Sequence, residues 1–213
     1  MSTYNKGILG GFSGKTGSVI GTSWKGRTVM RSLPSKKTKV SSKKQLEQQE
    51  KFKLTVDFLS GMADLLSISF GAFASHVSGY NAAVSYNLQK AVIGADSPFS
   101  IDFSLAQISL GVLPAASNPT AVAVAGNKVK FDWTDNSGTG KAAATDIVLL
   151  VAFCPETQRS VYTTAGATRS SLTHTLDTSV FAGNTVETWI AFMSADGKKC
   201  SDSRYTGLVT LTP

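Results

Sequence analysis

The chain contains few of the residues on which enzymatic sites and disulfide frameworks depend. Its 213 residues include two cysteines, Cys154 and Cys200, and two histidines, His76 and His174. Two thiols in a chain of this length do not form a disulfide scaffold, so we interpret both as isolated, inert thiols. The sequence also lacks the Gly-x-Ser-x-Gly, Cys-x-x-Cys and His-Glu-x-x-His patterns. It therefore predicts a protein that is not an enzyme and has no cofactor, no metal and no small-molecule substrate.

The histidines and the nearby carboxylates have simpler interpretations than a site. His174 falls on a predicted strand, where a structural role is far commoner than catalysis, and His76 has no cysteine or glutamate at metal-ligand spacing. Asp132, Asp135 and Asp146 have the side chains to chelate calcium across a loop. Capping of turns explains these three aspartates more simply.

Long hydrophobic runs and a high content of charge are also missing. No stretch approaches the ~20 apolar residues of a membrane span, and the N-terminus lacks the apolar core of a signal peptide. The sequence therefore predicts synthesis in the cytoplasm, with a virion or a released assembly as compatible final locations. Charged residues make up 16% of the chain, against about a quarter in a typical protein. This favours a surface that is largely covered by other copies of the chain.

Acidic residues are absent before Glu47, although the same region is rich in lysine, arginine and glycine. Residues 1–56 carry a net charge of +10 and residues 57–213 a net charge of −3. Such a segment has little apolar surface with which to fold alone, and its glycines add backbone entropy. We predict that residues 1–42 form an extended glycine-rich basic arm or a β-ribbon, shaped by contact with another molecule. The arm's glycines are Gly7, Gly10, Gly11, Gly14, Gly17, Gly21 and Gly26.

The arm has β-branched and alternating character in two runs, residues 18–24 and 27–33. Lys25 and Gly26 between them are typical of a tight hairpin, and Pro34 ends the ribbon. The residues 10–16, Gly-Gly-Phe-Ser-Gly-Lys-Thr, resemble a phosphate-binding loop, but that motif needs four residues between its first glycine and the Gly-Lys pair. The spacing here indicates a glycine turn.

The middle region, residues 43–114, is predicted to be a helical segment with one or two strands. Apolar residues recur at helical spacing over residues 43–70, where Gly61 either bends or splits the helix. A second helix is predicted for residues 80–92, and a strand for residues 99–105. The apolar stripe of the first helix consists of Leu46, Phe52, Val56, Leu59, Met62 and Leu66.

The region 115–213 has the pattern of an antiparallel β-sandwich, with Trp133 and Trp189 as core anchors. Turn residues separate its short, regularly spaced strands. The predicted fold class of the whole chain is α+β. The seven predicted strands are residues 121–125, 128–133, 145–153, 159–163, 170–176, 185–194 and 204–211.

Four segments of this last region form a family pattern: Lys-Val-Lys-Phe-Asp-Trp at 128–133, residues 173–176 with 182–185, Glu-Thr-Trp-Ile-Ala-Phe at 187–192, and residues 195–201. With these segments the region resembles a fibronectin type III domain, which implies an Ig-like fold and no particular ligand. In context the resemblance implies a spacer or an adhesion surface. Trp189 departs from the pattern, since those domains usually carry tyrosine there.

The first half contains, in order, a glycine-rich turn, an aromatic-basic strand, an Arg…Pro pair, a basic linker and a Gln-rich helix start. The segments concerned are residues 5–15, 21–26, 31–34 and 45–52. These segments are similar to the opening of a family of uncharacterised bacterial proteins of similar length that also end in an Ig-like domain. The same order of elements is similar to small proteins encoded among the structural genes of tailed phages, which implies a component of a particle or filament.

These observations favour a self-assembling structural protein, a subunit of a filament, tube or phage-like particle. The arm would pack on neighbouring subunits, with strand addition to an open sheet edge as one mode. The expected partner of the arm is another copy of the chain. The arm residues expected to make these contacts are Ile8, Leu9, Phe12, Val19, Ile20, Trp24 and Val29.

The alternative is a nucleic-acid-binding protein that uses the basic region 25–44 without sequence preference. Aromatic residues interleave with cations between residues 4 and 25: Tyr4, Phe12 and Trp24 alternate with Lys6, Lys15 and Lys25. A third interpretation is a binding module whose loops at 136–141 and 196–201 contact a cell-surface target. The predicted polyanion contacts are Lys25, Arg27, Arg31, Lys36, Lys37, Lys39, Lys43 and Lys44.

Overall fold

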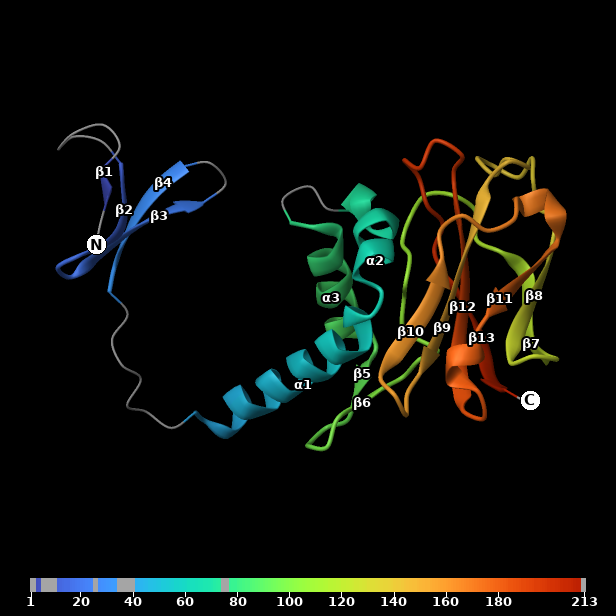
Figure 1. Ribbon diagram of the computed structural model, residues 1–213, viewed down its shortest axis with the longest axis horizontal. Coiled ribbons are helices and arrows are strands. Elements are labelled where there is room, and N and C mark those ends of the chain that lie inside the picture. Colours follow the sequence, from blue (N-terminus) through green and yellow to red (C-terminus); the bar gives the residue numbers. More distant parts are fainter. Residues whose placement is uncertain (1–2, 5–10, 25–26, 34–40, 74–76, 212–213) are drawn as a thin grey trace. The chain divides into compact units, whose positions relative to one another are not determined.

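The computed structural model describes residues 3–4, 11–24, 27–33, 41–73 and 77–211. The chain divides into two compact units, Met1–Ser42 and Lys43–Pro213, and each is described by itself. Helices and antiparallel sheets both occur, so the fold is mixed α+β (Figure 1).

The described part of the first unit is a four-stranded antiparallel sheet in the order β1-β2-β3-β4. Gly17, in the turn between β2 and β3, has a φ of +59°, a conformation that glycine adopts without steric cost. The predicted hairpin is present as β3 and β4, and its turn residues 25–26 lie outside the described residues. The strands are β1 Thr3–Tyr4, β2 Phe12–Thr16, β3 Val19–Trp24 and β4 Arg27–Ser32.

The second unit begins with the helices α1 (Lys43–Ser60), α2 (Ala63–Ser69) and α3 (Gly79–Lys90). The long helix predicted for residues 43–70 is split between Ser60 and Ala63. Ser78 caps α3, because its Oγ accepts a hydrogen bond of 3.2 Å from the Asn81 N–H. The shorter elements of this region are a 3₁₀ turn at Gly71–Phe73 and the hairpin β5 (Val92–Ile93) with β6 (Ser100–Ile101).

Two details of this region differ from the prediction. The strand predicted for residues 99–105 ends at Ile101, because Asp102 Oδ1 accepts a hydrogen bond from the Ser104 N–H and turns the chain. Leu46 and Phe52, predicted to lie on the buried stripe of α1, are 53% and 52% exposed. The residues of α1 that are buried lie in its second half, which is the part that packs on the body of the unit.

The C-terminal region forms two antiparallel sheets, one in the order β11-β8-β7 and one in the order β10-β9-β12-β13. All seven strands predicted there are present, with ends that differ by a few residues. Their bounds are β7 Ser117–Val124, β8 Lys128–Thr134, β9 Ile147–Cys154, β10 Arg159–Thr163, β11 Thr173–Asp177, β12 Thr185–Met193 and β13 Arg204–Thr210.

One buried cluster is shared by the two sheets. It includes the alternate residues Val129, Phe131 and Trp133 of β8, which face Ile190 and Phe192 of β12 across the cluster. The Trp133 ring packs edge-on against the Phe192 ring at 5.8 Å between centroids. The prediction that Trp133 anchors this core is confirmed.

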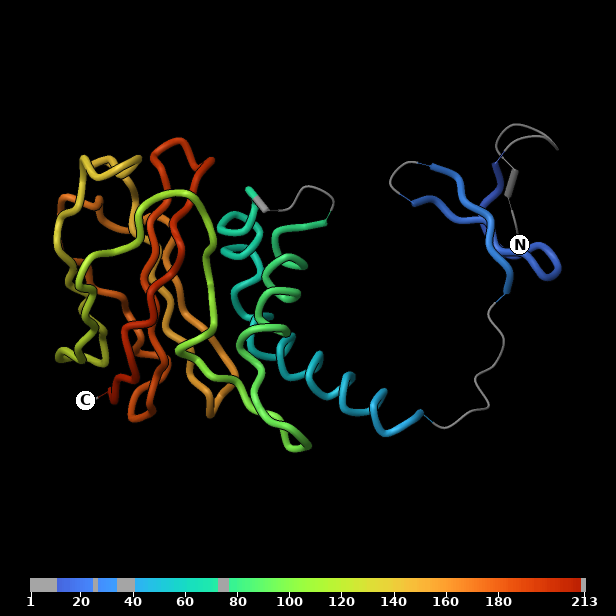
Figure 2. Tube along the Cα trace, turned by 180° about the vertical axis from the view of Figure 1, so that it is seen from behind, coloured from blue at the N-terminus to red at the C-terminus, as the bar shows by residue number. Residues whose placement is uncertain are grey.

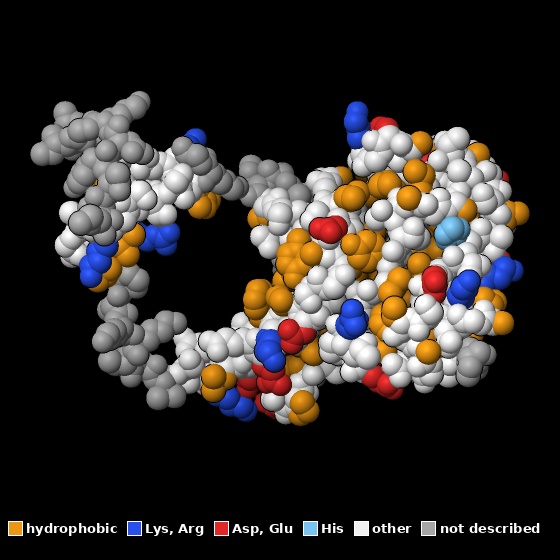
Figure 3. Space-filling view, viewed as in Figure 1, with side chains coloured by type: hydrophobic (Ala, Val, Ile, Leu, Met, Phe, Trp, Pro, Cys, Tyr) orange, Lys and Arg blue, Asp and Glu red, His pale blue; other side chains and the backbone are white. Residues whose placement is uncertain are grey.

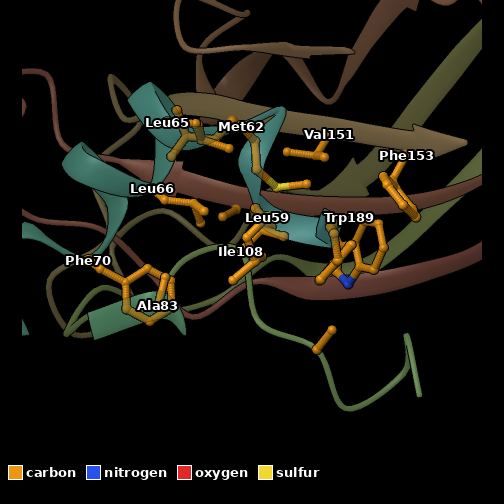
Figure 4. Packing of buried hydrophobic residues seen from close by; sticks show 14 of the residues in the cluster. Leu59, Met62, Leu65, Leu66, Phe70, Ala83, Ile108, Val151, Phe153 and Trp189 are labelled. Atoms are coloured by element: carbon orange, nitrogen blue, oxygen red, sulfur yellow. The ribbon is translucent and has the colours of Figure 1, made fainter. Parts of the chain in front are cut away.

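A second buried cluster lies on the other face of the four-stranded sheet, under the helices (Figure 2). Figure 4 shows Leu59 and Met62 facing Val151, Phe153 and Trp189 of the sheet. Trp189 is therefore a core residue, as predicted, but under the helical layer and not between the sheets. Because both faces of this sheet are covered, β9 and β12 are buried almost throughout.

Candidate functional site

The sheet of the first unit has two chemically different faces. Residues that pair directly across an antiparallel sheet share a face, and successive residues alternate between faces. The pairs Lys15↔Ile20, Ile20↔Arg31 and Trp24↔Arg27 therefore lie on one face, which we name the charged face. All the Lys and Arg side chains of β2, β3 and β4 lie there. The residues of the charged face are Lys15, Ile20, Thr22, Trp24, Arg27, Val29 and Arg31.

The opposite, uncharged face is partly covered by the start of β2. The Phe12 ring lies over Gly21, where an added Cβ would approach within 2.7 Å of Phe12 Cδ2. An added Cβ at Gly11 would lie 2.6 Å from Thr28 Cγ2, the end of a side chain. Gly21 is the residue that must be glycine, because its added Cβ would also clash with the Phe12 carbonyl oxygen and separate the two strands. The other paired residues of this face are Gly14, Thr16, Val19, Ser23, Met30 and Ser32.

The first unit buries very little of itself. Among residues 11–24 and 27–33, Gly21 is the single buried residue. Trp24 and Met30 are 62% and 67% exposed, and all six residues of β4 are exposed. The described part of this unit therefore shows no hydrophobic core of its own.

The charged face combines cations with an exposed indole. Lys15 and Arg31 are separated by one strand, which places them about 10 Å apart, and Arg27 and Arg31 are about 13 Å apart along β4. The three cationic side chains are exposed. In Figure 3 the described part of this unit shows cationic groups beside hydrophobic ones and no carboxylate. No acidic residue occurs among residues 1–46 to neutralise these charges.

The predicted assembly residues occupy both faces. Phe12 and Val19 are half-buried on the uncharged face, and Ile20 is half-buried on the charged face. Trp24 and Val29 are exposed on the charged face. Ile8 and Leu9 lie outside the described residues.

The predicted polyanion contacts are only partly described. Arg27 and Arg31 lie on the charged face, and Lys44 is exposed at the start of α1. Lys43 is engaged elsewhere, because its Nζ lies 3.2 Å from Asp96 Oδ1 and 3.6 Å from Glu47 Oε1. Lys25, Lys36, Lys37 and Lys39 lie outside the described residues. Lys15 was not among the predicted contacts, although hairpin register places it beside Ile20 and Arg31.

The aspartates considered for calcium have other partners. Asp146 forms a buried ion pair with Arg169, and Asp132 lies 3.0 Å from Lys130 Nζ. The Ser137 backbone N–H donates to Asp135 Oδ1 at 2.8 Å and lowers the pKa of that carboxyl. Within the described residues, no cluster of three His, Cys, Asp or Glu side chains could hold a metal.

A hydrogen bond between two side chains lies under the helical layer. Tyr205 OH donates a hydrogen bond to Glu187 Oε2, and Glu187 is 9% exposed. Burial raises the pKa of Tyr205, and the bond to the Glu187 carboxylate raises it further. The contact therefore keeps a buried carboxylate satisfied, a structural role.

The two cysteines lie on opposite sides of the four-stranded sheet. Cys154 belongs to the cluster between the sheets and Cys200 to the cluster under the helices, so they do not form a disulfide. Burial raises the pKa of Cys200 to about 11. The thiolate is the reactive form, so a raised pKa and burial both suppress reactivity.

We expect the native protein to react with a thiol-specific chromogenic reagent at pH 8 far more slowly than the denatured protein, in which both thiols react. Absorbance over time with and without denaturant measures this. The Cys154→Ser and Cys200→Ser variants show which thiol produces each absorbance change. A thiol that reacts in the native state at the denatured rate would contradict the buried positions.

Comparison with known proteins assigns the chain to a family. It belongs to a family of unknown function, DUF6266, whose model matches residues 11–207. No curated protein matches it. Among solved structures, the chain is similar to the fn3 domain of human collagen alpha-1(XX) chain, with 14% sequence identity and a TM-score of 0.34. The match covers 47% of this chain and 87% of that chain. In the described residues, no helix is long and apolar enough to cross a membrane.

Proposed function

We propose that this member of the DUF6266 family is a non-enzymatic, self-assembling structural protein, a subunit of a filament, tube or particle. The sheet of residues 3–32 would pack on a neighbouring subunit. The observation that carries the proposal is that Gly21 is the single buried residue among residues 11–24 and 27–33.

A sheet with so little burial needs a partner. Small sheets become stable when a hydrophobic face packs against another element, and segments of about 40 residues rarely fold alone. Covering a side chain such as Met30, which is 67% exposed, contributes about 1–2 kcal/mol. Burial of Val19, which lies half-buried on the same uncharged face, would add to this, and a second molecule packed on that face would supply the core that the sheet lacks.

The edge strand β4 offers a mode of attachment. It is paired with β3 on one side, and within the described residues no strand pairs with its other side. An exposed edge of this kind is a template for strand addition. Both Arg27 and Arg31 lie on it, so two copies of β4 would repel each other if they paired.

Charge therefore favours an attachment of the first unit to the second unit of a neighbour. Residues 1–42 carry eight Lys and Arg and no acidic residue, whereas residues 43–213 carry thirteen Lys and Arg and fourteen Asp and Glu. Like charges oppose contacts between two basic sheets, and a slightly acidic body does not. Head-to-tail contacts of this type generate rings or filaments.

We also infer that the two C-terminal sheets form a fibronectin type III or Ig-like β-sandwich, which would be the exposed module of the assembly. The strand orders β11-β8-β7 and β10-β9-β12-β13 and the shared core of the sheets support this. The helices would form a layer that closes one face of the sandwich.

Deletion of residues 1–34 tests the proposal. We expect the full chain to form oligomers in light scattering coupled to size exclusion, and the deletion variant to be a folded monomer with a cooperative thermal transition. Met30→Asp should weaken assembly of the full chain, because it places a charge at the exposed edge.

The matched control is Val180→Asp, since Val180 is also exposed, at 68%, but lies on the second unit. It should leave assembly unchanged. A deletion variant that still forms the full oligomer would overturn the proposal, as would a full chain that stays monomeric at high concentration.

A further inference from the structure

We infer that the charged face of the first unit binds single-stranded nucleic acid, with phosphates on Lys15, Arg27 and Arg31 and a base stacked on Trp24. The inference goes beyond the proposed assembly and does not rest on it. It concerns the charged face of the sheet, whereas Phe12 lies on the uncharged face.

The first argument is charge. All described cations of β2, β3 and β4 share one face, and the opposite face has none. No acidic residue precedes Glu47, so nothing within this unit neutralises them. Hydrogen-bonded strands fix the Cα atoms of these three residues at spacings of about 10 to 16 Å. A set of fixed, exposed cations of one sign selects an extended polyanion over a single small anion.

The second argument is the position of the indole. Trp24 is 62% exposed and lies directly opposite Arg27 in the β3–β4 pair. A sheet that presents an aromatic ring beside cations is a platform on which unpaired bases stack while the backbone is neutralised. An anionic membrane or a sulfated polysaccharide would use the charges but has no base to place on the ring. The bases of a duplex are already stacked on one another.

The third argument is that the two faces allow both roles at once. The uncharged face carries Phe12, Val19 and Met30, which suit protein packing. The charged face can then stay accessible to a nucleic acid when the other face is covered. Binding of this type has no sequence preference, because every base has a π-face and every nucleotide a phosphate.

The test uses the full chain and a fluorescein-labelled oligothymidylate, with binding followed by fluorescence anisotropy over a series of salt concentrations. The variant Lys15→Gln/Arg27→Gln/Arg31→Gln removes three phosphate contacts. The slope of log K against log salt should become shallower by about 2, which lowers affinity about 100-fold at 0.1 M salt. The matched control, Lys90→Gln/Lys141→Gln/Lys198→Gln, removes the same charge from exposed positions of the second unit and should leave the slope unchanged.

The indole is tested separately from the charges. Trp24→Ala should weaken oligothymidylate binding about tenfold, and Trp24→Phe much less, because a phenyl ring still stacks. Neither change should alter binding to inorganic polyphosphate, which has charge but no base. Equal losses on both polymers would overturn the stacking role.

The oligomeric state of every variant is measured alongside binding. A triple variant that binds like its control, or a full chain that does not bind oligothymidylate at 50 mM salt, would overturn the inference whether or not the chain assembles. If the triple variant loses its oligomeric state, binding is measured with the single variants Arg27→Gln and Arg31→Gln instead. Each should reduce the slope by about 0.7, and an unchanged slope in both would overturn the inference.

Discussion

Replacing Arg169 with methionine is expected to lower the free energy of unfolding by about 3–5 kcal/mol. The Arg169 side chain is fully buried, and its Nη2 lies 3.0 Å from Asp146 Oδ2, which is also buried. Its Nη1 donates to Asn136 Oδ1 at 2.5 Å, and Nη2 donates to the Pro114 carbonyl oxygen at 3.1 Å. Methionine fills the space but leaves the Asp146 carboxylate without its counter-charge.

The surroundings explain why lysine should not restore the stability. The guanidinium lies 3.8 Å from the centroid of the Phe192 ring and reaches three oxygen acceptors from one planar group. Burial lowers the pKa of Arg169, and the bond to Asp146 opposes that shift. A lysine ammonium is a point charge that cannot reach the same acceptors in one plane. We expect Arg169→Lys to remain clearly destabilised.

Urea unfolding followed by tryptophan fluorescence measures these changes. Arg159→Met, at an exposed position of β10, is the control and should change stability by no more than about 0.5 kcal/mol. The double variant Asp146→Asn/Arg169→Met should lose less than the two single variants added together, because neither charge is then left alone. A loss below about 1 kcal/mol for Arg169→Met would contradict a structural role for the pair.

A fragment of residues 115–213 is expected to aggregate, although it contains both C-terminal sheets. Without the helices, the outer face of the four-stranded sheet would be open to solvent. Exposed apolar patches larger than a few hundred Å² make a domain associate or precipitate. The side chains that would become exposed are Leu149, Val151, Phe153, Trp189, Ala191 and Met193.

The fragment 43–213 is the matched control, because it keeps the helical layer and should remain in solution and unfold cooperatively. Fluorescence of a dye that binds apolar surface should be high for 115–213 and low for 43–213. Replacing Leu149, Val151 and Phe153 with threonine should recover part of the shorter fragment from the pellet. A monomeric 115–213 that is as stable as 43–213 would show that the helices are not needed to cover the sheet.

Local signals were sufficient to place the strands of the C-terminal region. Val129, Phe131 and Trp133 alternate with polar residues, as the half-buried strand β8 requires, and turn residues mark the ends of the strands. The helical periodicity placed α1 to α3 but overextended the buried stripe to Leu46 and Phe52. Periodicity shows which face of a helix is apolar, whereas burial depends on where the neighbouring elements end.

The candidate site was recognised only in part. The basic composition and Trp24 drew attention to the first unit, and a tight hairpin at residues 25–26 already implies that Trp24 lies opposite Arg27. Lys15 was recognised as one of the cations that alternate with aromatic residues but was not among the predicted polyanion contacts, because its place across Ile20 from Arg31 depends on the register of a second hairpin. The buried ion pair of Arg169 was missed because arginine is rarely buried and nothing in its local sequence indicates burial.

The sequence by itself determined where the helices and the strands of the C-terminal region form and that all charge of the first 46 residues is positive, since propensity, periodicity and composition are local properties. The tertiary structure decided that the helices cover the four-stranded sheet, that Trp189 lies beneath them, and that the cations of the first unit gather on one face. These features depend on contacts between residues far apart in the chain, and the free energy of such contacts is set by which surfaces meet, a quantity that no short window of sequence contains.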